Sequence, residues 1–259
     1  MDGVGPIRSS MRGNQYLWTF INDVTRDAKI VCTAANANFP TIAKQFLREL
    51  HSDMKLHGMN EVEIAMTNHC MQVRGDSAKQ FTSPESVVEF ELHGIRVSFS
   101  APYTASSNSY VERFHQTLLQ SAFAMIYHGW APLSAWCFAA EHALAIYRLM
   151  PHSSLPNRQS PMQYTTGELP PWEWLETFWA VAAIYIPKPQ RAKGQPRCVF
   201  GRWVGHDLNR RSHIVLIPTG DRWKVRYTAH CRVDPTSRPP RPSRLVVPGF
   251  VNYDDDHSD

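Results

Sequence analysis

A chain of 259 residues that is 43% hydrophobic can bury one large core and a second, smaller one. No apolar run approaches the roughly 18 residues that span a bilayer, and the polar, glycine-rich first residues are not expected to act as a signal peptide. The five cysteines are scattered without a Cys-x-x-Cys pair, so neither a zinc finger nor a disulfide framework is expected. A reducing compartment is the default for such a chain.

The net charge of +4 is unevenly distributed. Residues 187–245 hold fourteen Lys and Arg against three Asp, whereas residues 246–259 hold four Asp and no basic residue. Residues 1–186 are mildly acidic, with thirteen basic and sixteen acidic side chains. A basic region beside a mildly acidic core is typical of an appendage that binds a polyanion. A solvated basic face without a partner is the alternative.

Residues 1–150 alternate between strand and helix patterns, and they are expected to form one α/β domain. Short apolar or alternating segments predict strands over residues 17–21, 28–34, 62–66, 71–74 and 95–99. Apolar spacings of three and four predict helices over residues 40–57, 83–93, 109–127 and 135–150. The alanine-rich helix 135–150, capped by Ser134, is expected to lie in the core, with a dimer interface as the alternative.

The composition changes after residue 150. Residues 151–177 are rich in Pro and Ser and are expected to form an irregular linker. A small basic β-domain is expected over 178–234, with strands over residues 180–186, 199–204, 213–217 and 223–227. Its tryptophans Trp203 and Trp223 are predicted to lie in its core rather than to stack on bases. Residues 235–259 are expected to be extended and disordered.

Two carboxylates in the first domain lie at predicted element boundaries, one after a short apolar segment and one at the start of a helix. Asp76 follows a short apolar segment, and Glu112 lies 36 positions later, in the first turn of the helix predicted over 109–127. The helix dipole alone favours an acid there, so Glu112 by itself indicates little. Between the two carboxylates, residues 94–104 read Gly-Ile-Arg-Val-Ser-Phe-Ser-Ala-Pro-Tyr-Thr, which predicts a strand followed by a loop.

These segments together resemble the catalytic core of the retroviral and retrotransposon integrases, most closely the copia-like class. In that family a strand ends in Asp-Asn-Gly-Gly-Glu-Phe, a Gly-Ile-x-x-x-x-Ser-x-Pro-Tyr-Thr segment follows, and a helix opens near Asn-Gly-Val-Ala-Glu-Arg. This chain has Asp76 to Phe81, the 94–104 segment, and Asn108 to Arg113 in the same order. The resemblance implies a ribonuclease H-like mixed sheet flanked by helices, followed by a small all-β, barrel-like domain.

The family's third carboxylate lies on the first strand, shortly before a Gly-Pro pair, and Asp2 fits that place. Only Met1 precedes Asp2, so the first strand is expected to be truncated. The resemblance identifies the nearby Asn22-Asp23 pair as a strand end without a catalytic role. The predicted catalytic residues and metal ligands are therefore Asp2, Asp76 and Glu112. Three converging carboxylates repel one another unless cations bind between them, and their oxygens suit a two-metal site for Mg²⁺ or Mn²⁺.

The resemblance implies an integrase-type polynucleotidyl transferase that trims the 3′ ends of element DNA and joins them to target DNA. It also implies double-stranded DNA as the partner, a homo-oligomeric state, no membrane partner, and a nuclear or otherwise cytoplasmic location. Phosphate contacts are expected from the start of the Glu112 helix and from the small domain. The candidate residues are Asn108, Ser109, Arg113, Arg191, Lys193, Arg197, Arg202, Arg210 and Arg211. Each is also consistent with a solvated surface residue.

The sequence departs from the family in ways that affect activity. Ser77-Ala78-Lys79-Gln80 replaces the glycine-rich segment after the second aspartate, and His115-Gln116 replaces an Asn-Arg or Asn-Lys pair that meets DNA. These changes suggest a degenerate element, and weak or no strand transfer is expected from the isolated chain. The alternatives are a catalytically inactive nucleic-acid-binding relic and a ribonuclease H-like nuclease that cuts RNA–DNA hybrids.

Overall fold

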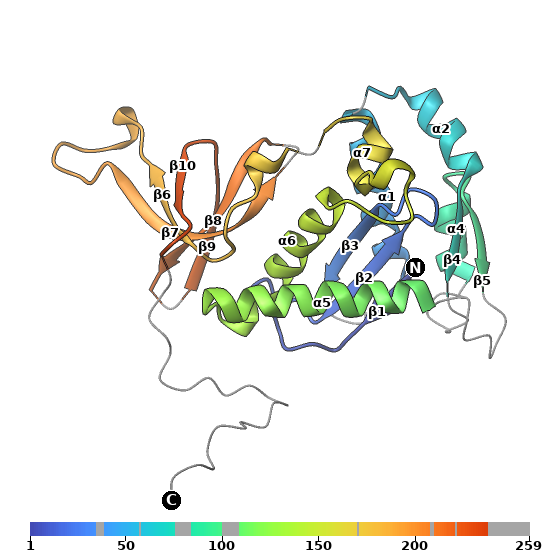
Figure 1. Cartoon of the computed structure of the whole chain (residues 1–259), viewed down its shortest axis with the longest axis horizontal. Coiled ribbons are helices and arrows are strands. Elements are labelled where there is room, and N and C mark those ends of the chain that lie inside the picture. Colours follow the sequence, from blue (N-terminus) through green and yellow to red (C-terminus); the bar gives the residue numbers. More distant parts are fainter. Residues whose placement is uncertain are drawn as a thin grey trace, which may run out of the picture.

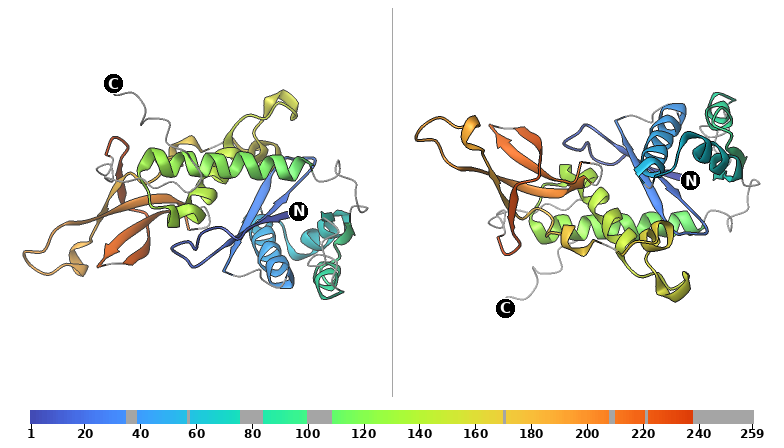
Figure 2. Two further views of the ribbon diagram at one scale, coloured as in Figure 1. Left: turned by 90° about the horizontal axis from the view of Figure 1, so that it is seen from below. Right: turned by 90° about the horizontal axis from the view of Figure 1, so that it is seen from above.

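The computed structural model describes residues 1–34, 39–56, 58–75, 84–99, 109–169, 171–207, 210–220 and 222–237. These residues form a mixed α/β region followed by a smaller region with a single antiparallel sheet, named the smaller sheet after that region (Figure 1). Both views in Figure 2 place the smaller sheet at one end of the molecule and α2, α4, β4 and β5 at the other. Helix α5 runs along the molecule between these two ends.

The first sheet consists of three antiparallel strands, which are β1 (Asp2–Val4), β2 (Tyr16–Ile21) and β3 (Ala28–Thr33). Strand β2 lies in the middle, and four consecutive residues from Leu17 to Phe20 are buried, so both faces of the sheet are covered. Leu17 packs into one apolar cluster, whereas Trp18 packs into another on the opposite face. The strands predicted over 17–21 and 28–34 are confirmed.

A second, parallel pair joins β4 (Gln72–Gly75) and β5 (Arg96–Phe99), as predicted for both segments. The amino group of Met1 donates a hydrogen bond of 2.7 Å to the carbonyl oxygen of Arg74, which connects the start of β1 to β4. A Cβ atom on Gly75 would lie only 2.6 Å from Cε of Met1. The end of β4 therefore lies directly beside the start of β1.

Helices cover both faces of the first sheet. Helices α1 (Phe39–Leu56) and α4 (Pro84–Glu91) cover the Trp18 face, where the rings of Phe20 and Phe46 stack with centroids 4.0 Å apart. Helices α5 (Ser109–Gly129) and α6 (Trp136–Leu149) cover the Leu17 face. Positive φ angles at Gly58 and Gly94 lie just after α1 and α4, where the sequence predicts those helices to stop.

The strand predicted over 62–66 is wrong, because this segment lies in helix α2 (Glu61–Cys70). The side chain of Asn60 accepts hydrogen bonds of 3.0 Å from the backbone N–H groups of Val62 and Glu63. The carboxylate of Glu63 in turn accepts the N–H of Asn60 at 2.8 Å, which completes a capping box. Met66, like Val62, is exposed, so the apolar residues that suggested a strand do not serve a sheet.

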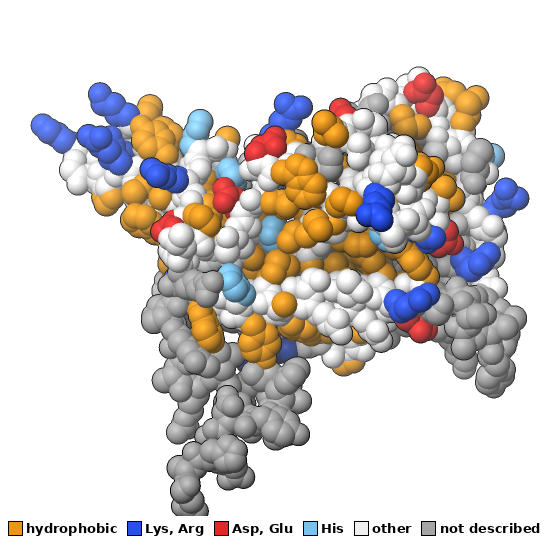
Figure 3. Space-filling model, in the orientation of Figure 1, with side chains coloured by type: hydrophobic (Ala, Val, Ile, Leu, Met, Phe, Trp, Pro, Cys, Tyr) orange, Lys and Arg blue, Asp and Glu red, His pale blue; other side chains and the backbone are white. Residues whose placement is uncertain are grey.

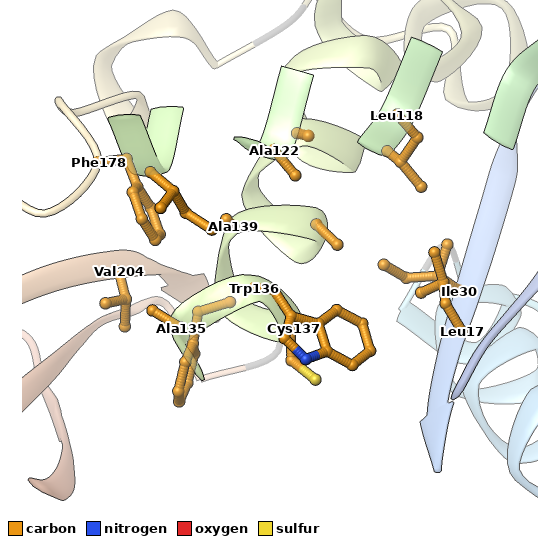
Figure 4. Packing of buried hydrophobic residues seen from close by; sticks show 14 of the residues in the cluster. Leu17, Ile30, Leu118, Ala122, Ala135, Trp136, Cys137, Ala139, Phe178 and Val204 are labelled. Atoms are coloured by element: carbon orange, nitrogen blue, oxygen red, sulfur yellow. The ribbon is translucent and has the colours of Figure 1, made fainter. Parts of the chain in front are cut away.

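Helix α6 lies in the core, as predicted, with eight of its residues buried. Ser134 does not cap it; a 3₁₀ turn at Leu133–Ala135 leads into the helix without a side-chain cap. The alanines allow neighbouring elements to approach closely, and α6 packs between the first sheet and the smaller sheet (Figure 4). The labelled residues of this shared cluster include Leu17 and Ile30 on one side, Trp136 and Ala139 on α6, and Phe178 and Val204 on the other side.

The smaller sheet has the strand order β10-β6-β7-β8-β9 and is antiparallel throughout. Its strands are β6 (Val181–Tyr185), β7 (Cys198–Asp207), β8 (Ser212–Thr219), β9 (Arg222–Thr228) and β10 (Cys231–Asp234). Trp203 is fully buried in its core, as predicted. The prediction for Trp223 is wrong: it lies on the outermost strand β9 and is 37% exposed, with its ring edge against Trp179. Closure into a barrel stays a prediction.

The segment between the two sheets contains regular structure that its composition did not predict. Helix α7 (Pro161–Thr166) begins at Ser160, whose hydroxyl accepts the N–H of Gln163 at 3.1 Å. Short 3₁₀ turns lie at Pro156–Arg158 and Trp172–Trp174 in this segment, and a further one lies at Lys188–Gln190 between β6 and β7.

No helix within the described ranges combines the length and apolarity needed to cross a bilayer. The four cysteines whose side chains are described, Cys32, Cys137, Cys198 and Cys231, are free thiols.

An ion pair connects the C-terminal end of α6 to the turn between β2 and β3. Arg148 donates two hydrogen bonds to the carboxylate of Asp27, from Nε at 2.6 Å and from Nη2 at 2.9 Å. Burial alone would lower the pKa of Arg148, but the adjacent Asp27 carboxylate outweighs burial and raises it. Both side chains are mostly buried, so solvent screens the pair only weakly.

We predict that Asp27→Ala lowers the free energy of unfolding by about 3 kcal/mol, because it leaves the Arg148 charge buried without its partner. Urea unfolding followed by circular dichroism measures this change. Lys55→Ala removes the exposed Lys55–Glu61 pair and is the matched control, with stability close to that of the parent chain. Equal effects of the two substitutions would contradict the prediction.

His142 of α6 lies at the contact with the smaller sheet. Its ring stacks on Phe178 with centroids 6.0 Å apart and meets the ring of Trp203 edge-on at 4.9 Å. Burial lowers the pKa of His142 to about 4, and a backbone hydrogen bond at Glu176 opposes this shift only in part. The folded chain therefore holds a neutral imidazole here at pH values where an exposed histidine is charged.

We predict that His142→Phe flattens the pH dependence of stability below pH 6.5. Between pH 6.5 and about pH 4 the unfolded state binds a proton that folded His142 does not, so stability falls as the pH falls, by about 3 kcal/mol in total. Thermal unfolding across this range measures the slope. His230→Phe changes an exposed histidine and is the control, which should leave the slope of stability against pH unchanged. An unchanged slope in His142→Phe would refute the assignment.

Candidate functional site

The structure fixes the position of Asp2, the first predicted ligand, by backbone pairing. Asp2 begins β1 opposite Thr19 of the central strand β2. One carboxylate oxygen, Oδ1, accepts the N–H of Gly3 at 2.8 Å. The side chain remains 22% exposed, so its carboxylate lies at the boundary between the core and solvent.

His115 of α5 connects Asp2 to the sheet. Its Nε2 lies 2.5 Å from Oγ1 of Thr19, and its Nδ1 lies 3.4 Å from Oδ2 of Asp2. We assign the Thr19 hydroxyl as the donor to Nε2, which leaves Nδ1–H directed at the carboxylate. Both His115 and Thr19 are buried, so solvent does not compete for these contacts.

The electrostatic environment keeps the Asp2 carboxylate ionised. Burial alone would raise the pKa of Asp2. The hydrogen bonds from His115 and from the N–H of Gly3 outweigh burial, and the pKa of Asp2 is lowered from its ordinary value. Asp2 therefore carries its negative charge at neutral pH.

Glu112 lies three residues before His115 on α5, in the first turn of the helix. Residues three apart on a helix share a face, so the backbone of Glu112 lies one turn away from the residue that contacts Asp2. Its side chain is exposed and free to reach solvent. The fold thus brings two of the three predicted carboxylates, 110 positions apart in the sequence, to one edge of the sheet.

Asp76 lies outside the described residues, as does Asn108. Gly75, which precedes Asp76, is the last residue of β4 and packs against Met1, the neighbour of Asp2. No group of three or more His, Cys, Asp or Glu side chains suited to a metal ion occurs within the described ranges, which exclude Asp76.

The Asn22-Asp23 pair forms the turn after β2. The side-chain oxygen of Asn22 accepts the backbone N–H groups of Val24 and Thr25, at 2.8 and 3.0 Å. This side chain is committed to the turn, in agreement with its expected role as a strand end.

The start of α5 is anchored by aromatic contacts. The Arg26 guanidinium lies 4.4 Å from the centre of the Tyr110 ring, and the hydroxyl of Tyr147 on α6 donates to the carbonyl of Arg26 at 3.0 Å. The Phe114 ring meets Tyr147 edge-on at 4.7 Å. Arg113 is exposed on this turn, close to Glu112, and the helix begins at Ser109, whose side chain is not described.

The basic residues predicted in the smaller domain fall into two groups at opposite ends of β7. One group lies in the connection between β6 and β7, and the other lies in the turn between β7 and β8. Strand β7 has ten residues, so its ends are about 30 Å apart. The first group comprises Arg191, Lys193 and Arg197, the second comprises Arg210 and Arg211, and Arg202 lies on β7 between them.

The guanidinium groups of these arginines differ in their partners. Arg210 is paired with Asp207 at 3.6 Å and lies over the ring of Tyr227. Arg202 is half-buried, which lowers its pKa, and its Nη1 is 3.4 Å from the carbonyl of Trp179. Arg191 has a buried Nη1 atom without a hydrogen-bond partner in the described structure.

Sequence reasoning missed the role of His115, which it treated as a lost DNA contact. The structure buries His115 and directs it at Asp2. The spacing of three residues from Glu112 was a signal for a shared helical face, but spacing alone does not show which face meets β1.

No protein-family model matches the chain. A chain in the cryo-EM structure of the simian T-cell lymphotropic virus intasome in complex with PP2A regulatory subunit B56 gamma is similar at 14% identity and a TM-score of 0.44. That alignment covers 84% of this chain and 72% of the other.

The Retrovirus-related Pol polyprotein from transposon TNT 1-94 of Nicotiana tabacum is 27% identical over 206 residues. The alignment covers 79% of this chain, and it spans only 14% of the length of that polyprotein. This similarity to a part of a retrotransposon polyprotein agrees with the resemblance found in the segments around Asp76 and Glu112.

Proposed function

We propose that the chain is an integrase-type polynucleotidyl transferase that processes DNA 3′ ends and joins them to target DNA during retrotransposon integration. The observation that carries this proposal is the contact between His115 and Asp2, 3.4 Å from Nδ1 to Oδ2. This contact holds the start of β1 against α5, one helical turn from Glu112. The end of β4, which leads to Asp76, packs on Met1 at the same edge.

The residues at this edge fit divalent cations of the Mg²⁺ or Mn²⁺ type. Asp2 is ionised, and its oxygens are hard ligands. Glu112 is exposed to solvent and can turn toward such an ion. In our proposal Asp2, Asp76 and Glu112 hold the ions. Such a pair of ions, when bound, activates a water or a DNA 3′-hydroxyl and stabilises the leaving oxygen.

The chain's own residues would orient the carboxylates and the substrate. Thr19 holds the His115 ring through Nε2, and the ring orients the Asp2 carboxylate through Nδ1. The N-terminus of α5 presents backbone N–H groups that suit a phosphate, and Arg113 adds a positive charge beside Glu112. Anchoring by Tyr110 and Tyr147 holds this helical end in place.

We further propose that the smaller sheet binds double-stranded DNA through its basic residues, that the chain acts as a homo-oligomer, and that it works in the nucleus. The separation of the basic groups along β7 would let one chain contact phosphates about 30 Å apart. Arg191, Lys193, Arg197 and Arg211 are the side chains best placed for this role, since Asp207 neutralises Arg210.

A second candidate function is a nucleic-acid-binding protein without catalytic activity. Both oxygens of Asp2 face protein donors, Gly3 N–H and the His115 ring, which compete with a cation for them. The sequence also places Lys79 three residues after Asp76, where the family has a flexible glycine-rich segment. These features agree with weak strand transfer by the isolated chain.

We predict weak Mn²⁺-dependent cleavage of labelled element DNA ends in a gel assay. Asp76→Asn and Glu112→Gln should each reduce cleavage by roughly 100-fold or more, because each removes a metal ligand. Binding to the same DNA should survive and should remain sensitive to salt. Asp23→Asn changes an exposed carboxylate in the turn after β2 and is the matched control.

The outcomes separate the candidates. If the parent chain does not cleave DNA, and if the parent and all variants bind DNA equally well, the non-catalytic protein is favoured. Preferential cutting of RNA–DNA hybrids would favour a ribonuclease H-like nuclease. Efficient joining of ends to target DNA would show that the departures around Lys79 and His115 do not impair the site.

We predict that His115→Ala weakens Mn²⁺ binding by about 10- to 100-fold, because Asp2 loses the partner that orients its carboxylate. His115→Asn retains a donor at this position and should recover part of the affinity. Isothermal titration calorimetry measures the dissociation constant. Gln116→Ala, at the exposed neighbouring position of α5, is the control. Equal affinities of His115→Ala and Gln116→Ala would exclude a positioning role for His115.

A further inference from the structure

The outer face of the smaller sheet exposes two aromatic rings near its basic end. Tyr185 on β6 is 49% exposed and Phe200 on β7 is 61% exposed. The register pairs Tyr185 with Cys198 and Ala183 with Phe200, so the side chains of all four residues lie on one face. The opposite face is the buried core that contains Trp203.

Arginines flank these rings on the same face. Arg202 pairs with Val181 across β6 and β7, and Arg232 of β10 pairs with Ala183. The aromatic–basic face is defined here as Ala183, Tyr185, Phe200, Arg202 and Arg232. Because Ala183 has a small side chain, it leaves space between the larger residues around it.

The spacing of the two rings suits consecutive bases of an unpaired strand. Tyr185 and Phe200 are diagonal neighbours in the antiparallel pair, and such neighbours lie about 7–8 Å apart at their backbones. Small RNA-binding sheets use two aromatic side chains in this arrangement to stack two or three bases. A duplex keeps its bases stacked on one another and offers only its backbone to such a surface.

The charge around the face suits a polyanion. From Val181 to Arg202 the chain has no Asp or Glu, and it has five basic residues, namely Lys188, Arg191, Lys193, Arg197 and Arg202. Figure 3 shows basic and apolar side chains gathered together on this arm of the molecule. Asp234 pairs with Val181 on the same face, and its carboxylate interacts with the charge of Arg232, so the net positive charge comes chiefly from the β6–β7 connection and Arg202.

We propose that the aromatic–basic face binds single-stranded nucleic acid, with Tyr185 and Phe200 stacking on unpaired bases and the nearby arginines contacting the phosphates. This binding function goes beyond the proposed catalysis and does not require a metal ion. A patch that serves only to pair two copies of the chain would also bury the rings, but it would gain nothing from the excess of positive charge around them.

Fluorescence anisotropy of the full chain with a labelled twelve-nucleotide oligothymidylate, in EDTA, tests the proposal. Tyr185→Ala and Phe200→Ala should each weaken binding by about 5- to 150-fold, the range expected for one stacked base. Binding to a DNA duplex of equal charge should change less than about twofold. Trp172→Ala removes an exposed aromatic side chain outside the sheet and should not change either affinity. Phe200→Leu keeps apolar area but removes the ring, and it should behave like Phe200→Ala.

An abasic oligonucleotide of the same length separates stacking from charge. It should bind the parent chain weakly, and Tyr185→Ala should not weaken that binding further. Circular dichroism of each variant checks that the chain remains folded. Equal losses on single strand, duplex and abasic DNA would overturn the proposal, as would unchanged affinity in both alanine variants. A dimer that dissociates in Phe200→Ala without loss of oligothymidylate binding would instead identify the face as an interface between copies. EDTA suppresses any metal-dependent reaction, so failure of the catalytic proposal would leave this result unaffected.

Discussion

The position of helix α5 against strands β1 and β2 is the constraint on which the candidate site depends. Phe114, Leu118, Ala122 and Ile126 form the apolar stripe that packs α5 into the cluster it shares with α6 and the first sheet. At one end of this stripe, buried His115 contacts the Thr19 hydroxyl and the Asp2 carboxylate, so polar contacts continue the apolar packing there. Because a buried hydrogen-bonding group is costly to leave unsatisfied, this connection fixes the rotation of α5 about its axis. The direction of Glu112 follows from that rotation.

The sequence predicted most of the elements because their patterns coincide with their burial. Strand β2 and helix α5 carry the expected periodicity, and glycines with positive φ lie just after α1 and α4. The strand predicted over 62–66 failed because Val62 and Met66 face solvent while Ile64 between them is buried, so this short alternation of apolar residues does not distinguish a strand from a helix. The Asn60 to Glu63 capping box was a better signal there than hydrophobicity, since it depends on local hydrogen bonds alone.

The candidate site could be predicted only in part. The family resemblance predicted Asp2 and Glu112 as partners in one site; the structure shows Asp2 in contact with His115, which lies one turn after Glu112 on α5, and the shared site stays a prediction. Spacing could not show that His115 faces inward or that Arg210 is already paired with Asp207. It also could not show that Trp223 lies on an edge strand while Phe200 is turned outward. These properties depend on strand order and register, which a single sequence does not encode locally.

The shared apolar cluster around α6 has a consequence for how this chain can be divided. Val204 and Leu216 from the smaller sheet, with Phe178 and Trp179 just before β6, pack in the same cluster as Leu17 and Ile30 from the first sheet. If the chain were cut in the segment near residue 170 and the two parts separated, each part would expose its share of this apolar cluster to water. Proteolysis or recombination at that segment should therefore yield aggregating pieces rather than two independent modules. The two sheets therefore depend on one shared core for their stability.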